Sequence, residues 1–596
     1  MKASLFSKLF IYVVFFFFTA SLVSCTRKEK TVKDVMDNAI SNLYKTMNAK
    51  ELSELDDEKV LSLFSKDELQ VLSSHHWMFD ANVPVVVSIM RSNGQKKLPF
   101  WLTEKGFVKT DKIVKSEQTT YDVWQKSFEA GTVGLGINGF ENFGLHYFVS
   151  VIAQNKSDQL ELSNFFPENQ YVGVMDIGAF TYHDWDELVL TEVPDELRGQ
   201  KLLTTIRGRG RGTHLIGAFR TTPFQSSEKP DQVVLTWSEE PSSTQTIQWR
   251  TNPTAKGVVR YWEKGAGPED NFTEVNSENI VIEDRLLQND QFINHHTGTL
   301  KNLKPATNYH YIVGDPNLNI WSEEADFTTA PNGPAPFSFV YFGDTHRSPH
   351  WGELIHSVYK RHQNTAFYII GGDLVSTGLY RDEWDKLLGY SSDVLNKKPL
   401  MPVPGNHDNQ AGLGAKLYTD LFSLPMNGPD KVKPEQSYSF EYGNALYLMI
   451  DATSPYDDQT EWIENQLKQT NAKWKFAVSH FPPYCYEEDY KDIRDKWCTI
   501  FDKYHVDMVM SGHVHYYLRT KPMNNEKPVS SPAEGTIYVI SIAIPDNEGV
   551  IPEQSYADVQ FSGEMLYQTL DINGDTLVYK AMNIDGVVRD EMVITK

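Results

Sequence analysis

Five apolar runs in the second half of the chain each end abruptly in polar residues. They cover residues 337–342, 366–370, 400–403, 475–479 and 506–510. Helix-like segments separate these runs, so the pattern is βαβ and predicts a largely parallel sheet. Because the carboxyl ends of parallel strands lie along one edge, where ligands bind, we expect the polar residues after the runs to meet there: Asp344, His346, Asp373, Asn406, His407, His480, His513 and His515.

These side chains form a set that predicts a metal site. Carboxylate, amide and imidazole ligands together suit zinc, manganese, iron or cobalt as divalent ions. No thiolate is included, so the set differs from that of a structural zinc site. Singly, each residue has an ordinary role, such as helix capping by Asp344 or a hydrogen-bonded core histidine. Jointly, so many polar residues at strand ends would be costly to bury without a cation.

The motifs that contain these residues resemble the calcineurin-like metallophosphoesterase superfamily. A β-sandwich pattern precedes them, and that combination is similar to the purple acid phosphatase branch. The resemblance covers residues 335–596, or 229–596 with the sandwich, and leaves 26–225 outside. It rests on Asp-x-His (344–346), Gly-Asp-x-x-Ser (372–376), Gly-Asn-His-Asp (405–408), the strand-end His480 and Gly-His-Val-His (512–515).

The resemblance implies two divalent metal ions that share one bridging carboxylate, Asp373. The first metal is expected to take Asp344, His346 and His515, and the second Asn406, His480 and His513. His407 is expected to contact the phosphate and to protonate the leaving oxygen. Asp408 either orients the His407 imidazole, which is the preferred hypothesis, or only stabilises the loop.

The chain departs from the purple acid phosphatase pattern at three places. His346 stands where that branch usually has glycine, and Ser376 where it has a metal-bound tyrosine. The loop after His480 reads FPPYCYEEDYKD and lacks the histidines that often follow there. The first metal therefore has the ligand set of the wider superfamily, which predicts a colourless, divalent enzyme. Tyr380 is the nearest alternative tyrosine.

Two metal ions about 3.5–4 Å apart can hold a bridging hydroxide for in-line attack on a phosphoryl group. The sequence thus predicts a phosphohydrolase for small phosphate esters, with monoesters preferred. The alternatives are a phosphodiesterase or nucleotide pyrophosphatase with the same site, and a surface binding protein with a vestigial metal domain. A net charge of −23 argues against nucleic-acid binding.

The N-terminus has the pattern of a processing segment. Lys2 and Lys8 precede a short apolar stretch, 9–23, and Cys25 follows small residues. This resembles a bacterial lipoprotein signal peptide, residues 1–25, which implies lipidation of Cys25 and a membrane-anchored protein of the bacterial cell envelope. An ordinary signal peptide or a short membrane anchor is the alternative.

The chain is long enough for several domains. Residues 26–225 predict an accessory domain that begins with helices up to about 75 and continues as an α+β or all-β module. Its tract RGRGRG (207–212) is expected to form a solvated hairpin, with anion binding as the alternative. Residues 229–330 have strands at sandwich-like spacing, and LKPATNY (303–309) resembles a tyrosine corner of fibronectin type III domains.

For residues 335–596 the family resemblance implies an α/β metallophosphoesterase domain of the αββα type. Residues 457–470 have the pattern of an amphipathic helix, and the turn at 573–575 predicts a C-terminal hairpin. Cys485 and Cys498 either form a disulfide or are separate buried thiols, and the sequence favours neither.

Overall fold

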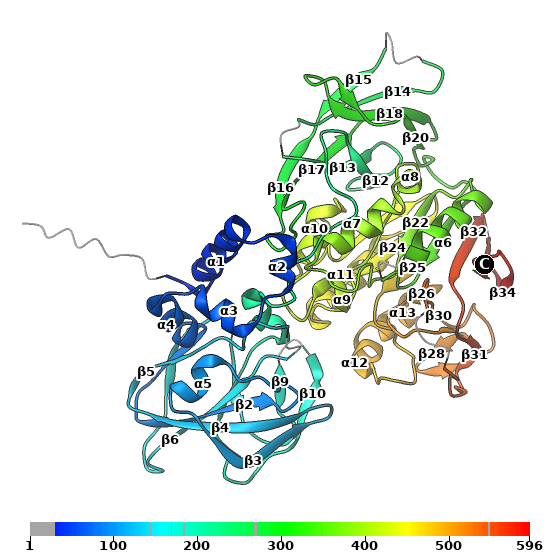
Figure 1. Cartoon of the computed structure of the whole chain (residues 1–596). Coiled ribbons are helices and arrows are strands. Elements are labelled where there is room, and N and C mark those ends of the chain that lie inside the picture. The colour runs from blue at the N-terminus through cyan, green and yellow to red at the C-terminus, as the bar shows by residue number, and fades with distance from the viewer. Residues whose placement is uncertain are drawn as a thin grey trace, which may run out of the picture.

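The computed structural model describes residues 30–142, 145–168, 170–182, 185–253, 256–266, 271–346, 349–545 and 549–596. The predicted signal peptide and Cys25 lie outside these residues. Three modules follow one another along the chain, and the predicted multi-domain fold is confirmed (Figure 1). No helix in the described part of the chain is both long and apolar enough to cross a membrane.

The N-terminal module begins with a layer of helices, as the periodicity predicts. Thr31 and Asp34 form a capping box at the start of the first helix, and one face of that helix is buried. A single-turn helix, α5, follows further along the chain. The helices are α1 (Val32–Thr46), α2 (Ala49–Ser53), α3 (Asp57–Ser62), α4 (Lys66–Ser74) and α5 (Phe100–Glu104).

Two antiparallel sheets complete this module. The smaller has the order β5 (Gly131–Leu135), β1 (Trp77–Ala81), β7 (Leu162–Phe166). The larger has the order β8 (Tyr171–Val174), β11 (Lys201–Thr204), β6 (Phe148–Ala153), β2 (Val85–Ser92), β4 (Thr120–Phe128), β3 (Val108–Ser116), β10 (Trp185–Glu192), β9 (Phe180–Tyr182).

The prediction of a solvated hairpin at RGRGRG (207–212) is wrong. This tract forms a 3₁₀ helix, η1 (Arg207–Thr213), in which Gly208 and Gly210 are buried. Gly208 donates its N–H to the carbonyl of Ala411 at 3.0 Å, and a Cβ at Gly208 would lie 2.7 Å from Leu413. The glycine spacing therefore allows close contact with residues 411–413 of the third module.

The second module is a β-sandwich with its core between two sheets. One sheet has the order β12 (Asp231–Thr236), β13 (Gln245–Thr251), β17 (Phe292–Leu300), β16 (Glu278–Glu283). The other contains β15 (Thr273–Asn276), β14 (Val258–Glu263), β18 (Asn308–Asp315), β19 (Ile320–Trp321) and β20 (Ala325–Thr328). The Tyr309 hydroxyl accepts a hydrogen bond from Lys304 N at 2.9 Å, as expected of a tyrosine corner.

The third module contains the predicted metal ligands and is called the catalytic module below. It contains two sheets packed face to face. The five-stranded sheet has the order β22 (Phe367–Ile370), β21 (Phe337–Phe342), β32 (Leu566–Asn573), β33 (Thr576–Asn583), β34 (Val588–Thr595). The seven-stranded sheet has the order β23 (Tyr438–Tyr442), β24 (Ala445–Ile450), β25 (Trp474–Ser479), β26 (Met508–Ser511), β30 (Ile537–Ile540), β27 (Tyr517–Thr520), β31 (Ala557–Phe561). A separate ribbon pairs β28 (Met523–Asn524) with β29 (Lys527–Pro528).

The core between these sheets is aromatic. Phe339 of β21 contacts Tyr447 and Phe476 of the other sheet, with ring centroids 5.2 and 5.5 Å apart. Helices cover the outer faces, which gives the predicted αββα layers. They are α6 (Pro349–Arg361), α7 (Arg381–Gly389), α8 (Ser392–Leu395), α9 (Asn406–Asn409), α10 (Lys416–Leu421), α11 (Asp457–Gln469), α12 (Lys491–Ile493), the π-helical turn η2 (Arg494–Cys498) and α13 (Thr499–Tyr504).

The expectation of largely parallel strands is wrong for this module as a whole. Among the described strands of this module, the parallel pairs are β21 with β22 and the run β24, β25, β26 and β30, and the other pairs are antiparallel. Two isolated parallel bridges join Asp344 to Ile542 and Tyr368 to Leu400. The run 400–403 lies along β22 through main-chain hydrogen bonds but forms no strand. The predicted helix at 457–470 and the hairpin at 573–575 are present as α11 and as the β32–β33 turn.

Cys485 and Cys498 are both free, so the disulfide alternative is not realised. Cys485 donates its thiol hydrogen to the Glu488 carbonyl at 3.2 Å, and Cys498 is buried.

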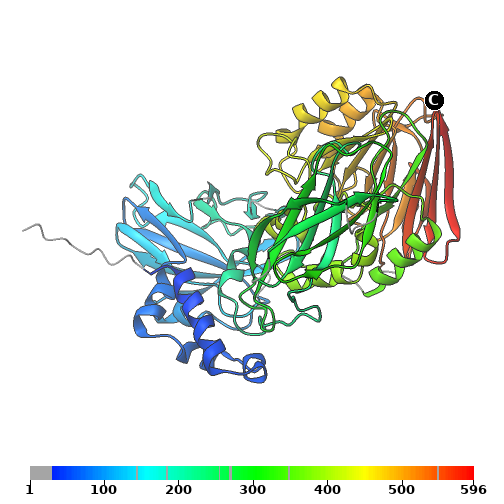
Figure 2. The ribbon, with the colours of Figure 1, turned by 90° about the horizontal axis from the view of Figure 1, so that it is seen from above.

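The sandwich module packs against the catalytic module. Leu400 N donates to the Leu235 carbonyl, and the Thr236 hydroxyl donates to the Ser423 carbonyl at 2.6 Å. In Figure 2 the N-terminal module and strands β32–β34 lie at opposite ends of the molecule.

Candidate metal centre

Strand ends from both sheets of the catalytic module deliver the predicted ligands to one place. Asp344 and Asp373 follow the parallel strands β21 and β22, and His480 follows β25. His513 follows β26, which is parallel to β25. Parallel pairing within each sheet thus brings the carboxyl ends together, as the sequence argument requires.

The first group of ligand atoms belongs to Asp344, His346 and His515, all within 4.8 Å of one another. The Asp344 Oδ2 atom lies 3.5 Å from His346 Nε2 and 3.6 Å from His515 Nε2. The two Nε2 atoms are 3.2 Å apart. Because Asp344 is buried and both histidines are only partly exposed, the three donors converge on one small volume at the edge of the sheets.

The second group contains Asp373, His480 and His513, whose ligand atoms also lie within 4.8 Å of one another. His480 Nε2 is 3.2 Å from Asp373 Oδ2 and 3.1 Å from Asn406 Oδ1. The side chain of Asn406 therefore reaches the same group. All seven predicted metal ligands thus fall into two clusters, with the membership that the family resemblance implies.

Main-chain amides and close glycines hold the carboxylates in place. His513 N donates to Asp344 Oδ1, and His407 N donates to Asp373 Oδ1, each at 2.9 Å. A Cβ at Gly512 would lie 2.1 Å from Asp344 Oδ1, and one at Gly405 would lie 2.2 Å from Asp373 Oδ1. These two positions require glycine so that the backbone can approach the carboxylates.

Three of the ligands have left-handed backbone conformations. The φ angles are +43° at His346, +49° at Asp373 and +73° at His513. Non-glycine residues rarely adopt such angles, and residues that do are concentrated at functional sites.

The electrostatic balance of the site favours cations. Burial alone would raise the pKa of Asp373, but His480 and His407 outweigh it and lower the pKa to about 2. Burial alone would lower the pKa of His480, but Asp373 and Asp344 raise it to about 10. The carboxylates thus stabilise positive charge among the imidazoles, and a divalent metal can take that role once the imidazoles are neutral. Donor types and arrangement both fit divalent metal ions.

His407 lies beside both groups without belonging to either. Its ring contacts that of His346 edge to face at 5.2 Å, and its Nε2 is 3.9 Å from Asp373 Oδ2. The side chain is 43% exposed, so a substrate can reach it.

Asp408 does not contact the imidazole that it was expected to orient. It is buried and accepts hydrogen bonds from the main-chain N–H groups of Gly405, Leu374 and Val375. Burial, followed by the nearby Asp373 charge, raises its pKa to about 7. The Ser376 carbonyl instead accepts from His407 Nδ1 at 2.8 Å. The preferred hypothesis for Asp408 is therefore replaced by the alternative, a loop-stabilising role.

Glu488 is a residue of the centre that the sequence argument missed. Its Oε1 lies 3.5 Å from His513 Nε2, and the Tyr490 hydroxyl donates to its other oxygen. The Phe481 ring packs against His513 at 4.7 Å. The acidic character of this loop was visible in the sequence. Nothing in the spacing distinguishes Glu488 from its acidic neighbours.

Comparison with known proteins agrees with this geometry. Residues 230–329 match the family model of the purple acid phosphatase N-terminal domain, and residues 337–517 match that of calcineurin-like phosphoesterases. Two consecutive regions of the chain are therefore similar to the two domains of purple acid phosphatases, and the predicted resemblance is confirmed.

Individual relatives are distant. Purple acid phosphatase 23 of Arabidopsis thaliana is 24% identical over 50% of this chain and 76% of the plant protein. A purple acid phosphatase of Glycine max is 26% identical over 50% of this chain and 67% of its own length. The uncharacterized protein Rv2577 of Mycobacterium tuberculosis is 26% identical, and the alignment spans only half of that protein.

Among solved structures, a purple acid phosphatase from yellow lupin (Lupinus luteus) seeds superimposes with a TM-score of 0.53. The superposition covers 88% of this chain and 91% of the lupin chain at 14% identity. At that identity the likeness concerns the fold alone.

Proposed function

We propose that this protein is an exported hydrolase that cleaves small phosphate monoesters with the help of two divalent metal ions. The observation that carries this proposal is the convergence of two ligand groups at one sheet edge, with the exposed His407 beside both. The matched phosphoesterase domain supports it.

Each residue has a definite task in this mechanism. Asp344, His346 and His515 would hold one metal, and Asn406, His480 and His513 would hold the other together with Asp373. Asp373 is proposed to be shared with the first metal. When bound, the metals would activate water and neutralise charge on the phosphoryl oxygens.

His407 supplies the proton for the leaving group. Because its Nδ1–H is engaged by the Ser376 carbonyl, Nε2 is the nitrogen directed toward the ligand groups. A protonated Nε2 can donate to the leaving oxygen as the phosphorus–oxygen bond breaks.

The proposed substrates are monoesters, and comparative rates test this preference. Purified protein loaded with zinc or manganese should hydrolyse p-nitrophenyl phosphate faster than bis(p-nitrophenyl) phosphate. The reverse order would favour the phosphodiesterase alternative. Absence of metal-dependent turnover on either ester would favour the binding-protein alternative.

We also propose that the mature protein is anchored to a bacterial envelope membrane through lipidated Cys25. The pattern of residues 1–25 supports this location. Cys25→Ser protein should move from the membrane to the soluble fraction after cell lysis. Continued sedimentation with membranes would contradict the anchor.

A further inference from the structure

A pocket of about 740 Å³ lies where the three modules meet. Helix α1 and the residues from η1 to Arg220 form one side of it. The turn between β16 and β17 and residues 379–380 of the catalytic module form the other. None of the predicted metal ligands is among the described residues that line it. We call this cavity the junction pocket.

Arg211 is the residue of the junction pocket that can bind an anion. Its side chain lines the cavity and is partly buried. Across the part of the chain that the structure describes, its guanidinium has no hydrogen-bond or ion-pair partner. Burial, and then the Arg207 charge, lower its pKa, while Tyr380 and Glu383 raise it. An arginine remains charged under such conditions, and a partly buried charge without a counter-ion is costly.

Lys33, Arg220 and Arg285 already have carboxylate partners, whereas Lys45 is exposed to solvent. Arg220 pairs with Asp284 and Asp382, and Arg285 pairs with Asp37. His214 is only 7% exposed, and burial together with Arg211 lowers its pKa to about 4, so it is neutral at pH 7. Arg211 therefore remains the partly buried cation that a ligand can engage.

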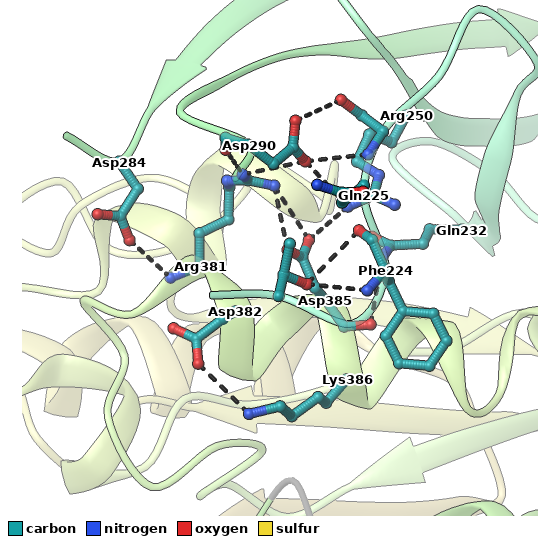
Figure 3. Close-up of polar contacts among 12 residues, drawn as sticks. Phe224, Gln225, Gln232, Arg250, Asp284, Asp290, Arg381, Asp382, Asp385 and Lys386 are labelled. Atoms are coloured by element: carbon teal, nitrogen blue, oxygen red, sulfur yellow. Dashed lines mark hydrogen bonds and ion pairs between the residues drawn. The ribbon is translucent and has the colours of Figure 1, made fainter. Parts of the chain in front are cut away.

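Two carboxylates next to α7, Asp284 and Asp382, are engaged elsewhere. Figure 3 shows Asp284 directed to the Arg381 main chain and Asp382 directed to Lys386. Arg381 in turn pairs with Asp385. These buried ion pairs and hydrogen bonds hold the side of the pocket next to α7 in place. The carboxylates of Asp284, Asp382 and Asp385 are therefore not available to neutralise Arg211.

The charge of the cavity contrasts with that of the whole protein. The chain carries a net charge of −23. The cavity is lined by five Lys or Arg side chains (Lys33, Lys45, Arg211, Arg220, Arg285) and only three carboxylates (Asp37, Glu283, Asp284). A planar guanidinium with a fork of N–H donors binds a carboxylate or a phosphate group in a bidentate manner.

Apolar side chains provide the rest of the lining. Ile40, Leu286 and Leu379 lie in the wall, and the Tyr380 ring is stacked against Arg220 at 3.8 Å. We propose that the junction pocket is a second ligand site, for a small organic anion whose carboxylate or phosphate pairs with Arg211 and whose apolar part contacts Leu286 and Leu379.

The junction pocket lies next to the chain segment that supports His407. Leu379 directly follows Gly378, whose N–H donates to the His407 carbonyl at 2.9 Å. Glu383 of α7 accepts from Thr377 N at 2.8 Å. A ligand packed against Leu379 therefore contacts the segment that supports His407, and hydrogen exchange at Gly378 should slow when the pocket is filled.

Calorimetric titration of the metal-loaded protein tests the site. Benzoate and phenylphosphonate serve as the two anionic probes, and benzamide is the neutral control. Binding at the metal centre is identified by its loss in Asp373→Asn. The junction pocket should bind at least one anionic probe in that variant too, and the tighter probe identifies carboxylate or phosphate as the preferred group.

Arg211→Met should weaken this second binding event at least tenfold, whereas Arg198→Met, at another arginine of the same module, should leave it unchanged. Ser41→Trp places a large side chain at an exposed position of the same wall and should block the site independently. Unchanged affinity in both pocket variants, equal affinity for benzamide, or no second binding event would overturn the proposal. All of these measurements detect ligand binding, so none of them depends on phosphatase turnover.

Discussion

His407 Nδ1 donates a hydrogen bond to the main-chain carbonyl of Ser376 at 2.8 Å. A carbonyl can only accept, so this contact fixes one ring proton on Nδ1. The other ring nitrogen, Nε2, then faces Asp373 Oδ2 at 3.9 Å. The loop that carries Asp373 thus also determines which nitrogen of His407 is directed toward the ligand groups.

His407→Ala should lower turnover about a hundredfold or more, because the leaving oxygen loses its proton donor. Both metals should remain bound, since His407 is outside both ligand groups. The loss should be smaller for esters with acidic leaving groups. Turnover against leaving-group pKa, with elemental analysis, checks this. His350→Ala, at a surface histidine that is 61% exposed, is the control, and an equal loss for all leaving groups would limit His407 to substrate binding.

Asp373→Asn should lose metal as well as activity. The amide removes one negative charge from the second ligand group, and its nitrogen cannot coordinate as the carboxylate oxygen does. Elemental analysis after dialysis against metal-free buffer measures the effect. Asp111→Asn, at a side chain that is 98% exposed, should retain both metals. Two equivalents of metal in Asp373→Asn would refute the assigned bridge.

Glu488→Gln should weaken binding of the second metal by about 10- to 100-fold, the range typical of partners that orient a ligand. The carboxylate lies 3.5 Å from His513 Nε2 and contributes negative charge there. Competitive metal titration with a chromophoric chelator provides the measurement. Glu487→Gln changes a neighbouring carboxylate that accepts from Tyr516 instead. If both variants bind metal alike, Glu488 has no such role.

Acid should destabilise the N-terminal module below about pH 6.5. His146 donates from Nδ1 to the Tyr147 carbonyl and accepts at Nε2 from His76, 2.9 Å away. Burial, and then Arg209, lower the pKa of both histidines, that of His146 to about 3. The unfolded chain therefore binds more protons than the folded chain. The free energy of unfolding decreases as the pH is lowered, by up to about 1.4 kcal/mol per pH unit for each histidine.

Hydrogen exchange of β2 amides between pH 7 and pH 5 measures this loss, after correction for the intrinsic exchange rate. His76→Gln retains a donor but cannot titrate, so its slope should be about half that of the unmodified protein. His350→Gln should leave the slope unchanged. Protection that does not vary with pH would contradict the role of the buried pair.

The purified protein should be colourless. Ser376 replaces the tyrosine that gives purple acid phosphatases their colour, and the nearest alternative, Tyr380, is held against Arg220 at 3.8 Å in the junction pocket. Absorption spectra of the metal-loaded protein and of Tyr380→Phe should be identical in the visible range. A visible band that disappears in Tyr380→Phe would show that this ring reaches a metal.

Much of the centre was predictable because strand ends are visible in the sequence. Apolar runs before Asp344, Asp373, His480 and His513 indicate buried strands, and parallel pairing within each sheet then brings their ends together. The error concerned the remaining strands. Several antiparallel pairs, such as β32 with β21, depend on long-range contacts that a local pattern does not contain.

Other features also depend on contacts between residues that are far apart in the sequence, so they could not be predicted. The RGRGRG tract forms η1 because Gly208 contacts Ala411, a residue 203 positions further along the chain. Asp408 binds main-chain amides of the loop at 374–375, and sequence spacing alone favoured a contact with its neighbour His407. Glu488 is selected from an acidic loop only by the fold, through Tyr490 and Cys485.

The left-handed conformations of His346, Asp373 and His513 have an evolutionary consequence. Each costs a non-glycine residue of the order of 1 kcal/mol or more, so mutation to glycine would relieve strain at all three positions. Under selection for folding alone, glycine would accumulate there. Only selection for the donor atoms themselves keeps two imidazoles and a carboxylate at these positions. Because the purple acid phosphatase branch usually has glycine at the position of His346, a lineage that abandoned catalysis should show its loss as glycine at 373 and 513.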